Sequence, residues 1–183
     1  MDKLEQLWSL SEIEAERSGL QFPYVFEPIG LILIRPVKQE QYESTPRNSM
    51  AFATPGGDGV HFSFVQLNGE VVDQSPIVMT VPMNFGSENL IVGTNFEDFL
   101  CLGCEVGFYF LEQLSYSDSK ADAIHWWSHP DEWFESQNVF PEDIDNNKRL
   151  LRLLRTEFNL QPWDNIVVKL QSLEDEYSSL LDL

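Results

Sequence analysis

Five short apolar runs separated by short connectors are the feature that most constrains the fold of this chain. The runs are rich in β-branched and aromatic residues and span residues 30–37, 50–54, 60–67, 77–83 and 89–93. Runs of this length and composition, bounded by turn residues, are typical of β-strands. None of the connectors could hold the crossover helix that parallel neighbours require. We therefore expect a largely antiparallel sheet built from consecutive hairpins.

The clearest turn in this region is the stretch Pro-Gly-Gly-Asp-Gly at residues 55–59. Its glycines can adopt a positive φ without the steric penalty of a Cβ atom. In the following strand, His61 and Ser63 alternate with Phe62 and Phe64. This alternation predicts one buried face of the sheet and one face in contact with water.

Helical patterns precede and follow the sheet. Residues 1–20 have helical periodicity, with Ser11 and Glu14 spaced as a capping box and Gly19 as a stop signal. After the strands, Thr94 and Glu97 have the spacing of a second capping box.

Further along, Gly103 interrupts that helix, and the patterns predict a second helix over 105–114, helical pieces within 115–147, a helix over 147–158 and a last helix after Pro162. The fold class we expect is α+β, with a mostly antiparallel central sheet, an N-terminal helix and several C-terminal helices. Residues 1–183 would form a single domain with a helical C-terminal extension from about residue 115.

The charge of the chain is strongly negative. It has 30 acidic and 11 basic side chains, a formal net charge of −19, where a small domain usually carries a magnitude of about 2 to 8. Binding to nucleic acid or to an anionic membrane is therefore disfavoured. The excess could serve solubility alone, or it could steer a basic partner toward the surface.

The remaining bulk features favour a cytoplasmic protein. The first residues are charged, no apolar run approaches the roughly 20 residues of a membrane span, and the only cysteines are Cys101 and Cys104. Two cysteines do not make the disulfide framework of a small secreted domain.

The motifs with potential chemistry favour structural roles. Cys101 and Cys104 have redox-dithiol spacing but fall at the C-terminal end of a predicted helix, where the dipole disfavours a thiolate. His125 and His129 could share a helix face, yet the glutamate of a zinc-protease motif is absent between them. No pairing of a nucleophile with a base stands out, so we expect no catalytic activity, no cofactor and no metal.

Two stretches are candidates for contact with a protein partner. The first mixes aromatic and acidic side chains, a composition found at interface hot spots as well as in cores; its residues are Trp126, Trp127, Asp131, Glu132 and Trp133. The second comprises Asp58 and His61 at the glycine-rich turn. The basic stripe over 148–155 is instead expected to pair with carboxylates of the same chain.

Three short motifs resemble the SUKH superfamily. They are GGDGVHF at 56–62, PIVM at 76–79 and VGTNFEDFL at 92–100, so the resemblance covers residues 50–102, roughly a third of the chain. The resemblance implies an α+β fold with a helix before a mostly antiparallel sheet and helices after it. It also implies a bacterial immunity protein of the SMI1/KNR4-like type, which neutralises a toxin, often a nuclease, without chemistry of its own.

The sequence therefore predicts a non-catalytic, protein-binding domain that docks a basic toxin or nuclease through its acidic surface. Two alternatives remain open at this point. One is a small-ligand-binding protein or enzyme with a pocket near His61 and the Cys101/Cys104 pair. The other is a regulatory adaptor.

Overall fold

The computed structural model describes residues 2–72, 74–136 and 140–183 and confirms the α+β class. Five strands form one antiparallel sheet in the order β1-β2-β3-β4-β5. Strands adjacent in the chain are thus adjacent in the sheet, as the short connectors predict. The strands are β1 (Ile32–Lys38), β2 (Ser49–Thr54), β3 (His61–Val65), β4 (Ile77–Thr80) and β5 (Asn89–Gly93).

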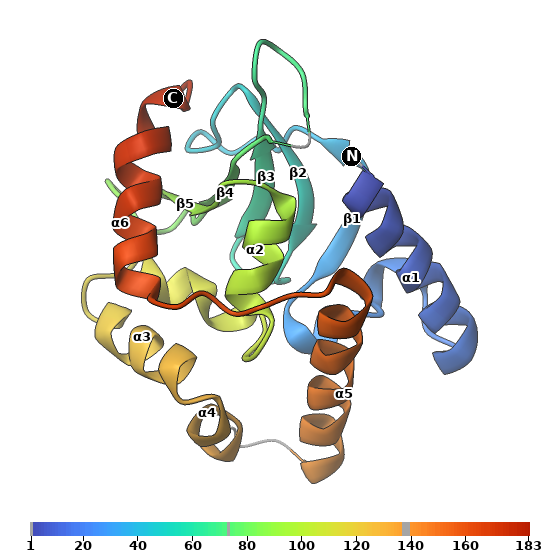
Figure 1. Cartoon of the computed structure of the whole chain (residues 1–183). Coiled ribbons are helices and arrows are strands. Elements are labelled where there is room, and N and C mark those ends of the chain that lie inside the picture. Colours follow the sequence, from blue (N-terminus) through green and yellow to red (C-terminus); the bar gives the residue numbers. More distant parts are fainter. Residues whose placement is uncertain (1, 73, 137–139) are drawn as a thin grey trace.

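Helices surround this sheet on several sides (Figure 1). The α-helices are α1 (Asp2–Ser18), α2 (Phe96–Gly103), α3 (Lys120–Ser128), α4 (Pro130–Ser136), α5 (Pro141–Phe158) and α6 (Ile166–Tyr177). The described residues also form the short 3-10 helices η1 (Phe22–Tyr24), η2 (Glu27–Ile29), η3 (Tyr109–Leu114) and η4 (Ser178–Leu180). Among the described residues, no helix has the length and apolar character needed to cross a membrane.

Phenylalanine side chains fill the space between the sheet and α2. The ring centroids of Phe62 and Phe99 lie 4.9 Å apart, those of Phe52 and Phe99 5.4 Å apart, and those of Phe99 and Phe108 5.0 Å apart. Each of these rings is fully buried. Tilted and edge-to-face pairs at such distances add to the stabilisation from burial. This cluster fixes α2 across one face of the sheet.

The opposite face of the sheet is also covered, so the prediction that His61 and Ser63 contact water is wrong. His61 is 2% exposed and Ser63 is fully buried. The connector between β1 and β2 folds back over them, with Thr45 Oγ1 3.2 Å from His61 Nε2 and the Tyr42 ring stacked on the imidazole at 5.8 Å. Small residues on this face, such as Ala51 opposite Ser63, allow the connector to approach closely.

The start of α2 differs from the predicted capping box by one residue. Asn95, not Thr94, is the N-cap, and its side-chain oxygen accepts a hydrogen bond from the Asp98 N–H at 3.0 Å. The Asp98 carboxylate in turn accepts hydrogen bonds from the Thr94 N–H and hydroxyl at 2.8 and 3.0 Å. Asp98 thus takes the place predicted for Glu97, but its carboxylate bonds Thr94, one residue before the N-cap, where a standard capping box bonds the N-cap N–H itself.

Two other helix predictions are wrong in part. Helix α2 ends at Gly103 as predicted, but residues 105–114 do not form a second α-helix, because Gly107 has a φ of 88° and the 3-10 helix η3 follows it. Helix α5 begins at Pro141, well before residue 147. The missed signal is a proline at the first helical position followed by two acidic residues, a common helix start.

The first helix ends at Ser18 before Gly19, as predicted, but Ser11 and Glu14 do not cap it. Both lie inside α1. The Glu14 side chain is buried and accepts hydrogen bonds from Arg17 at 2.7 Å and from Arg149 of α5 at 2.8 Å. The hydrogen bond from Arg149 lowers the Glu14 pKa and outweighs the opposing effect of burial. This ion pair ties α1 to α5.

Replacing Glu14 with glutamine should therefore destabilise the fold by about 1.5–3 kcal/mol at neutral pH, because charged hydrogen bonds to a buried acceptor are lost. The lowered pKa means that the stabilisation is present above the ordinary glutamate pKa and disappears as the pH falls through the folded-state value. Urea unfolding at neutral and acid pH measures both effects. Glu12→Gln, which removes an exposed pair with Arg35, is the matched control and should cost less than about 1 kcal/mol. Equal losses for the two variants would contradict this account.

Candidate protein-binding site

The tryptophan-rich segment forms the helical hairpin of α3 and α4. Trp127 anchors this hairpin, because its indole N–H donates a hydrogen bond to the Leu102 carbonyl at the end of α2 at 2.9 Å and its ring packs on the core. Trp126 and Trp133 are partly exposed, with ring centroids 6.1 Å apart, and Trp133 also lies 6.1 Å from Phe110. All three tryptophans are therefore partly exposed, and Trp127 and Trp133 also pack against the core.

The acidic residues of the hairpin are exposed and lie beside cationic or titratable groups. A Glu132 carboxylate oxygen lies 3.1 Å from His125 Nε2, and Asp131 lies 3.7 Å from the Lys148 ammonium. The rings of His125 and His129 stack at 4.4 Å. No set of three potential metal-ligating side chains occurs in the described part of the chain.

Asp58 and His61, the second predicted pair, differ in their exposure to solvent. Asp58 is exposed at the turn between β2 and β3 with a φ of 48°. His61 is enclosed, its Nδ1 hydrogen-bonded to the Gly59 carbonyl at 2.8 Å, and burial lowers its pKa. The folded chain therefore keeps the His61 side chain out of direct reach of a partner, in contrast to the prediction.

The two cysteines are free thiols at the C-terminal end of α2. Burial raises the pKa of Cys104 to about 12 and also raises the pKa of the partly buried Cys101. Both groups are thus protonated at neutral pH, which is unfavourable for redox or nucleophilic chemistry.

The basic stripe of α5 is largely neutralised by the same chain, as expected. Arg149 binds Glu14, Arg155 binds Glu105 at 2.9 Å, and Lys148 lies near Asp131. The fourth cation, Arg152, donates a hydrogen bond to the Lys148 carbonyl at 3.2 Å.

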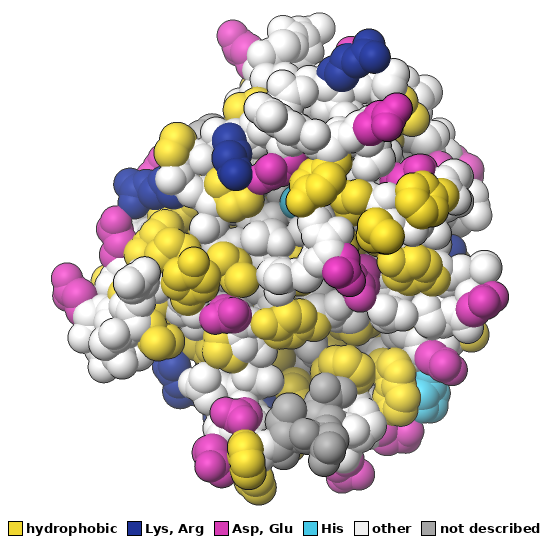
Figure 2. Space-filling view, turned by 180° about the vertical axis from the view of Figure 1, so that it is seen from behind, with side chains coloured by type: hydrophobic (Ala, Val, Ile, Leu, Met, Phe, Trp, Pro, Cys, Tyr) yellow, Lys and Arg dark blue, Asp and Glu magenta, His cyan; other side chains and the backbone are white. Residues whose placement is uncertain are grey.

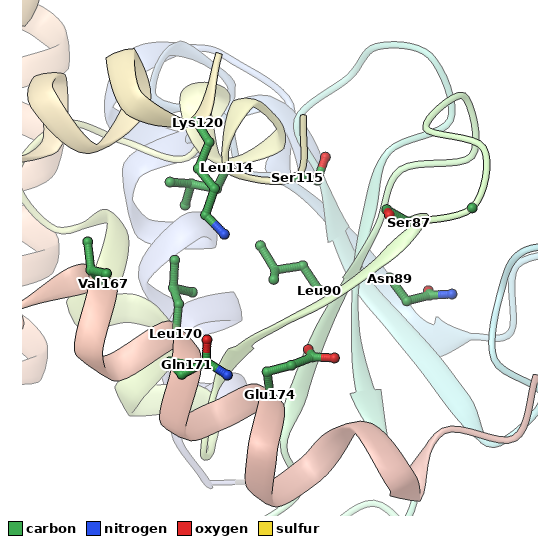
Figure 3. A pocket seen from close by; sticks show the side chains of 11 residues that line it. Ser87, Asn89, Leu90, Leu114, Ser115, Lys120, Val167, Leu170, Gln171 and Glu174 are labelled. Carbon is green, nitrogen blue, oxygen red and sulfur yellow. The ribbon is translucent and has the colours of Figure 1, made fainter. Parts of the chain in front are cut away.

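In the described part of the chain, three surface cavities of similar size, about 400–430 Å³ each, differ in the charge of their walls. A further hollow of about 730 Å³ is lined by residues of α6 alone, with two carboxylates and no aromatic ring. The cavity between β5, η3, α3 and α6 contains the Lys120 side chain, which points into it, with Glu174 on the opposite side (Figure 3). The cavity between α2, α4 and α5 is lined by Lys148, Arg152 and Arg155 together with three carboxylates. In these two cavities the chain supplies cations of its own.

The third cavity, which we call the acidic-aromatic pocket, has carboxylates and aromatic rings but no lysine, arginine or histidine in its walls. It has a volume of about 430 Å³ and lies between η2, η3, α4 and α5. Its walls are formed by Glu27, Pro28, Ile29, Val106, Tyr109, Trp133, Phe134, Asp143, Asn146, Asn147 and Leu151. Of the residues predicted from the sequence, only Trp133 lies in this pocket.

Close backbone packing holds two walls of this pocket together. The Phe108 N–H donates a hydrogen bond to the Ile29 carbonyl at 2.7 Å. Gly30, with a φ of 82°, lies so close to the next segment that a Cβ atom would be 2.5 Å from the Tyr109 nitrogen. A glycine is therefore required where η2 meets η3.

The electrostatics of the pocket are negative. Burial raises the pKa of Tyr109, and the nearby charge of Glu27 adds to this effect. Among the described residues, no lysine or arginine forms an ion pair with Glu27 or Asp143. The Asn147 side-chain oxygen is buried without a hydrogen-bond partner. The pocket thus offers the carboxylates of Glu27 and Asp143 and a negative potential to a cation.

No family model, no curated protein and no solved structure matches this chain.

Substitution of Gly30 by alanine should destabilise the fold by about 1–3 kcal/mol more than the same substitution at Gly19, as measured by urea unfolding. Both glycines have a positive φ, but a Cβ atom at Gly19 would meet no atom within 4 Å. The difference between the variants therefore isolates the close approach of η2 to η3. Similar losses at the two sites would disprove that contact.

Cys104 should resist alkylation in the native state. With a pKa of about 12, a fraction on the order of one in ten thousand of this thiol is ionised at pH 8. Mass spectrometry after iodoacetamide treatment at pH 8 should show labelling of Cys104 only after unfolding. Rapid native labelling, or an intramolecular disulfide with Cys101 under mild oxidation, would contradict the structural role.

Proposed function

We propose that this chain is a non-catalytic, protein-binding domain that docks a basic partner through its acidic surface. The main support for the proposal is that most lysine and arginine side chains are paired with carboxylates of the same chain. Of the 11 lysine and arginine side chains, at least eight lie within ion-pair distance of a carboxylate of the same chain. These are Lys3, Arg17, Arg35, Lys38, Lys148, Arg149, Arg155 and Lys169.

Those pairs engage seven of the 30 carboxylates, so most of the negative charge is not balanced locally. On the face opposite to that of Figure 1, acidic side chains are spread among hydrophobic ones and basic side chains are few (Figure 2). A field of this kind raises the rate of encounter with a basic protein by roughly 10- to 1,000-fold at low salt. The partly exposed Trp126 and Trp133 add amphipathic contact area of the kind enriched at interface hot spots.

The resemblance of residues 50–102 to the SUKH superfamily supports a toxin as the partner class. Nucleases bind a polyanion and carry basic surfaces, which complement a net charge of −19. An immunity-type inhibitor needs binding affinity but no catalytic groups. This proposal is consistent with cysteines that are protonated at neutral pH and a histidine that is enclosed.

The alternative of an enzyme or ligand site near His61 and the two cysteines has less support. Tyr42 and Thr45 cover His61, and the two thiols lie at the opposite end of α2 from its anion-favouring N-terminus. A regulatory adaptor would use the same acidic surface, and only the identity of the partner distinguishes it from an inhibitor.

The test is affinity capture with this protein as bait from lysate of its source cells, followed by association kinetics with the purified partner. We expect a basic protein at near-equal stoichiometry whose association rate falls at least roughly ten-fold between low and physiological salt. If the partner is a toxin, the complex should suppress its activity. Failure to capture a basic protein, or an association rate that does not change with salt, would overturn the proposal.

A further inference from the structure

We propose that the acidic-aromatic pocket binds the side chain of an arginine supplied by the protein partner. This inference rests on the proposed function, because it names the group of a basic partner that the surface receives.

The walls combine aromatic and aliphatic surface in a way that suits an arginine. Tyr109, Trp133 and Phe134 come from η3 and α4, while Ile29 and Leu151 provide aliphatic surface from η2 and α5. Guanidinium groups are weakly hydrated and are attracted to aromatic faces, and the three-carbon stem of arginine packs on apolar surface. A volume of about 430 Å³ is at the small end of ligand pockets, which favours a side chain over a large ligand.

The charges favour a cation in the pocket. Glu27 on η2 and Asp143 on α5 contribute carboxylates from two different elements, and neither has a lysine or arginine ion-pair partner among the described residues. The other two cavities contain basic side chains of this chain. Of the three, this is the pocket in which a foreign cation meets no internal competitor.

The aromatic walls and the carboxylates together favour arginine over lysine. A guanidinium is planar and weakly hydrated and has five N–H donors, so it can stack on an aromatic ring while it donates to a carboxylate. An ammonium is a compact, strongly hydrated point charge with three donors.

The neighbouring cavity already shows the same contact within the chain. Phe134 and Leu151 line both cavities. On the side of the basic stripe, the Lys148 ammonium lies 4.9 Å from the centre of the Phe134 ring. Phe134 of α4 thus contacts an internal cation and also lines the acidic-aromatic pocket.

The experiment is an NMR titration of the full chain with N-acetyl-L-arginine methylamide at constant ionic strength. Amide and side-chain shifts should change at Tyr109, Trp133 and Asn147, with an affinity in the millimolar range expected of a single side chain (about 1 mM corresponds to about 4 kcal/mol). The uncharged citrulline analogue should produce no localised changes, and the lysine analogue should bind more weakly.

Two exposed aspartates of α5 provide a matched pair of variants. Asp143→Asn removes a carboxylate of this pocket and should weaken the arginine probe roughly two- to five-fold. Asp145→Asn, two residues further on and lining the neighbouring cavity instead, should leave the affinity unchanged. Both side chains are exposed, so the fold should tolerate either substitution.

Absence of localised shifts up to about 20 mM probe, or equal responses to the arginine and citrulline analogues, would overturn the inference. Equal effects of the two aspartate variants would do so as well. If these results occurred while a basic partner still bound with a salt-dependent rate, the pocket would be ruled out and the proposed function would stand. If the arginine probe bound but no basic partner were captured, the pocket would be supported and the proposed function would be overturned.

Discussion

The phenylalanine cluster between the sheet and α2 is the contact on which the rest of the structure depends. Phe52 and Phe62 project from neighbouring strands and meet Phe99 of α2 and Phe108 just beyond it. Because this cluster places residues 107–109 against Ile29, it also determines where η2 and η3 meet. The acidic-aromatic pocket is therefore a secondary result of how the core is packed.

The carboxylates that form ion pairs within the chain are different from those that remain available to attract a partner. The buried Glu14 and its two arginines join α1 to α5, and most other cations are likewise held by carboxylates of the same chain. Ion pairs of exposed residues contribute little to stability. Their larger effect here is to leave the surface with an excess of acid and few basic side chains available to offset it.

The sequence was sufficient for the parts of the fold that depend on local patterns. Strand β5, the antiparallel hairpins and the end of α1 before Gly19 follow from periodicity and turn residues. The local pattern predicts water contact for the second face of the sheet because His61 and Ser63 are polar, but their burial depends on the connector between β1 and β2, whose path no local pattern records. No local pattern predicts the acidic-aromatic pocket either, since Glu27, Tyr109 and Asp143 are far apart in the chain and composition points only to Trp133.

Phe134 and Leu151 form a common wall between a cavity that contains cations of this chain and a pocket that contains none. An occupant of the pocket that displaced Phe134 would change the contact that Lys148 makes with this ring. Any such coupling would be reciprocal: the factor by which an occupant weakened the pairing of Lys148 with Asp131 would equal the factor by which that pairing weakened the binding of the occupant. The hairpin of α3 and α4 is thereby linked to a pocket that most of its residues do not touch.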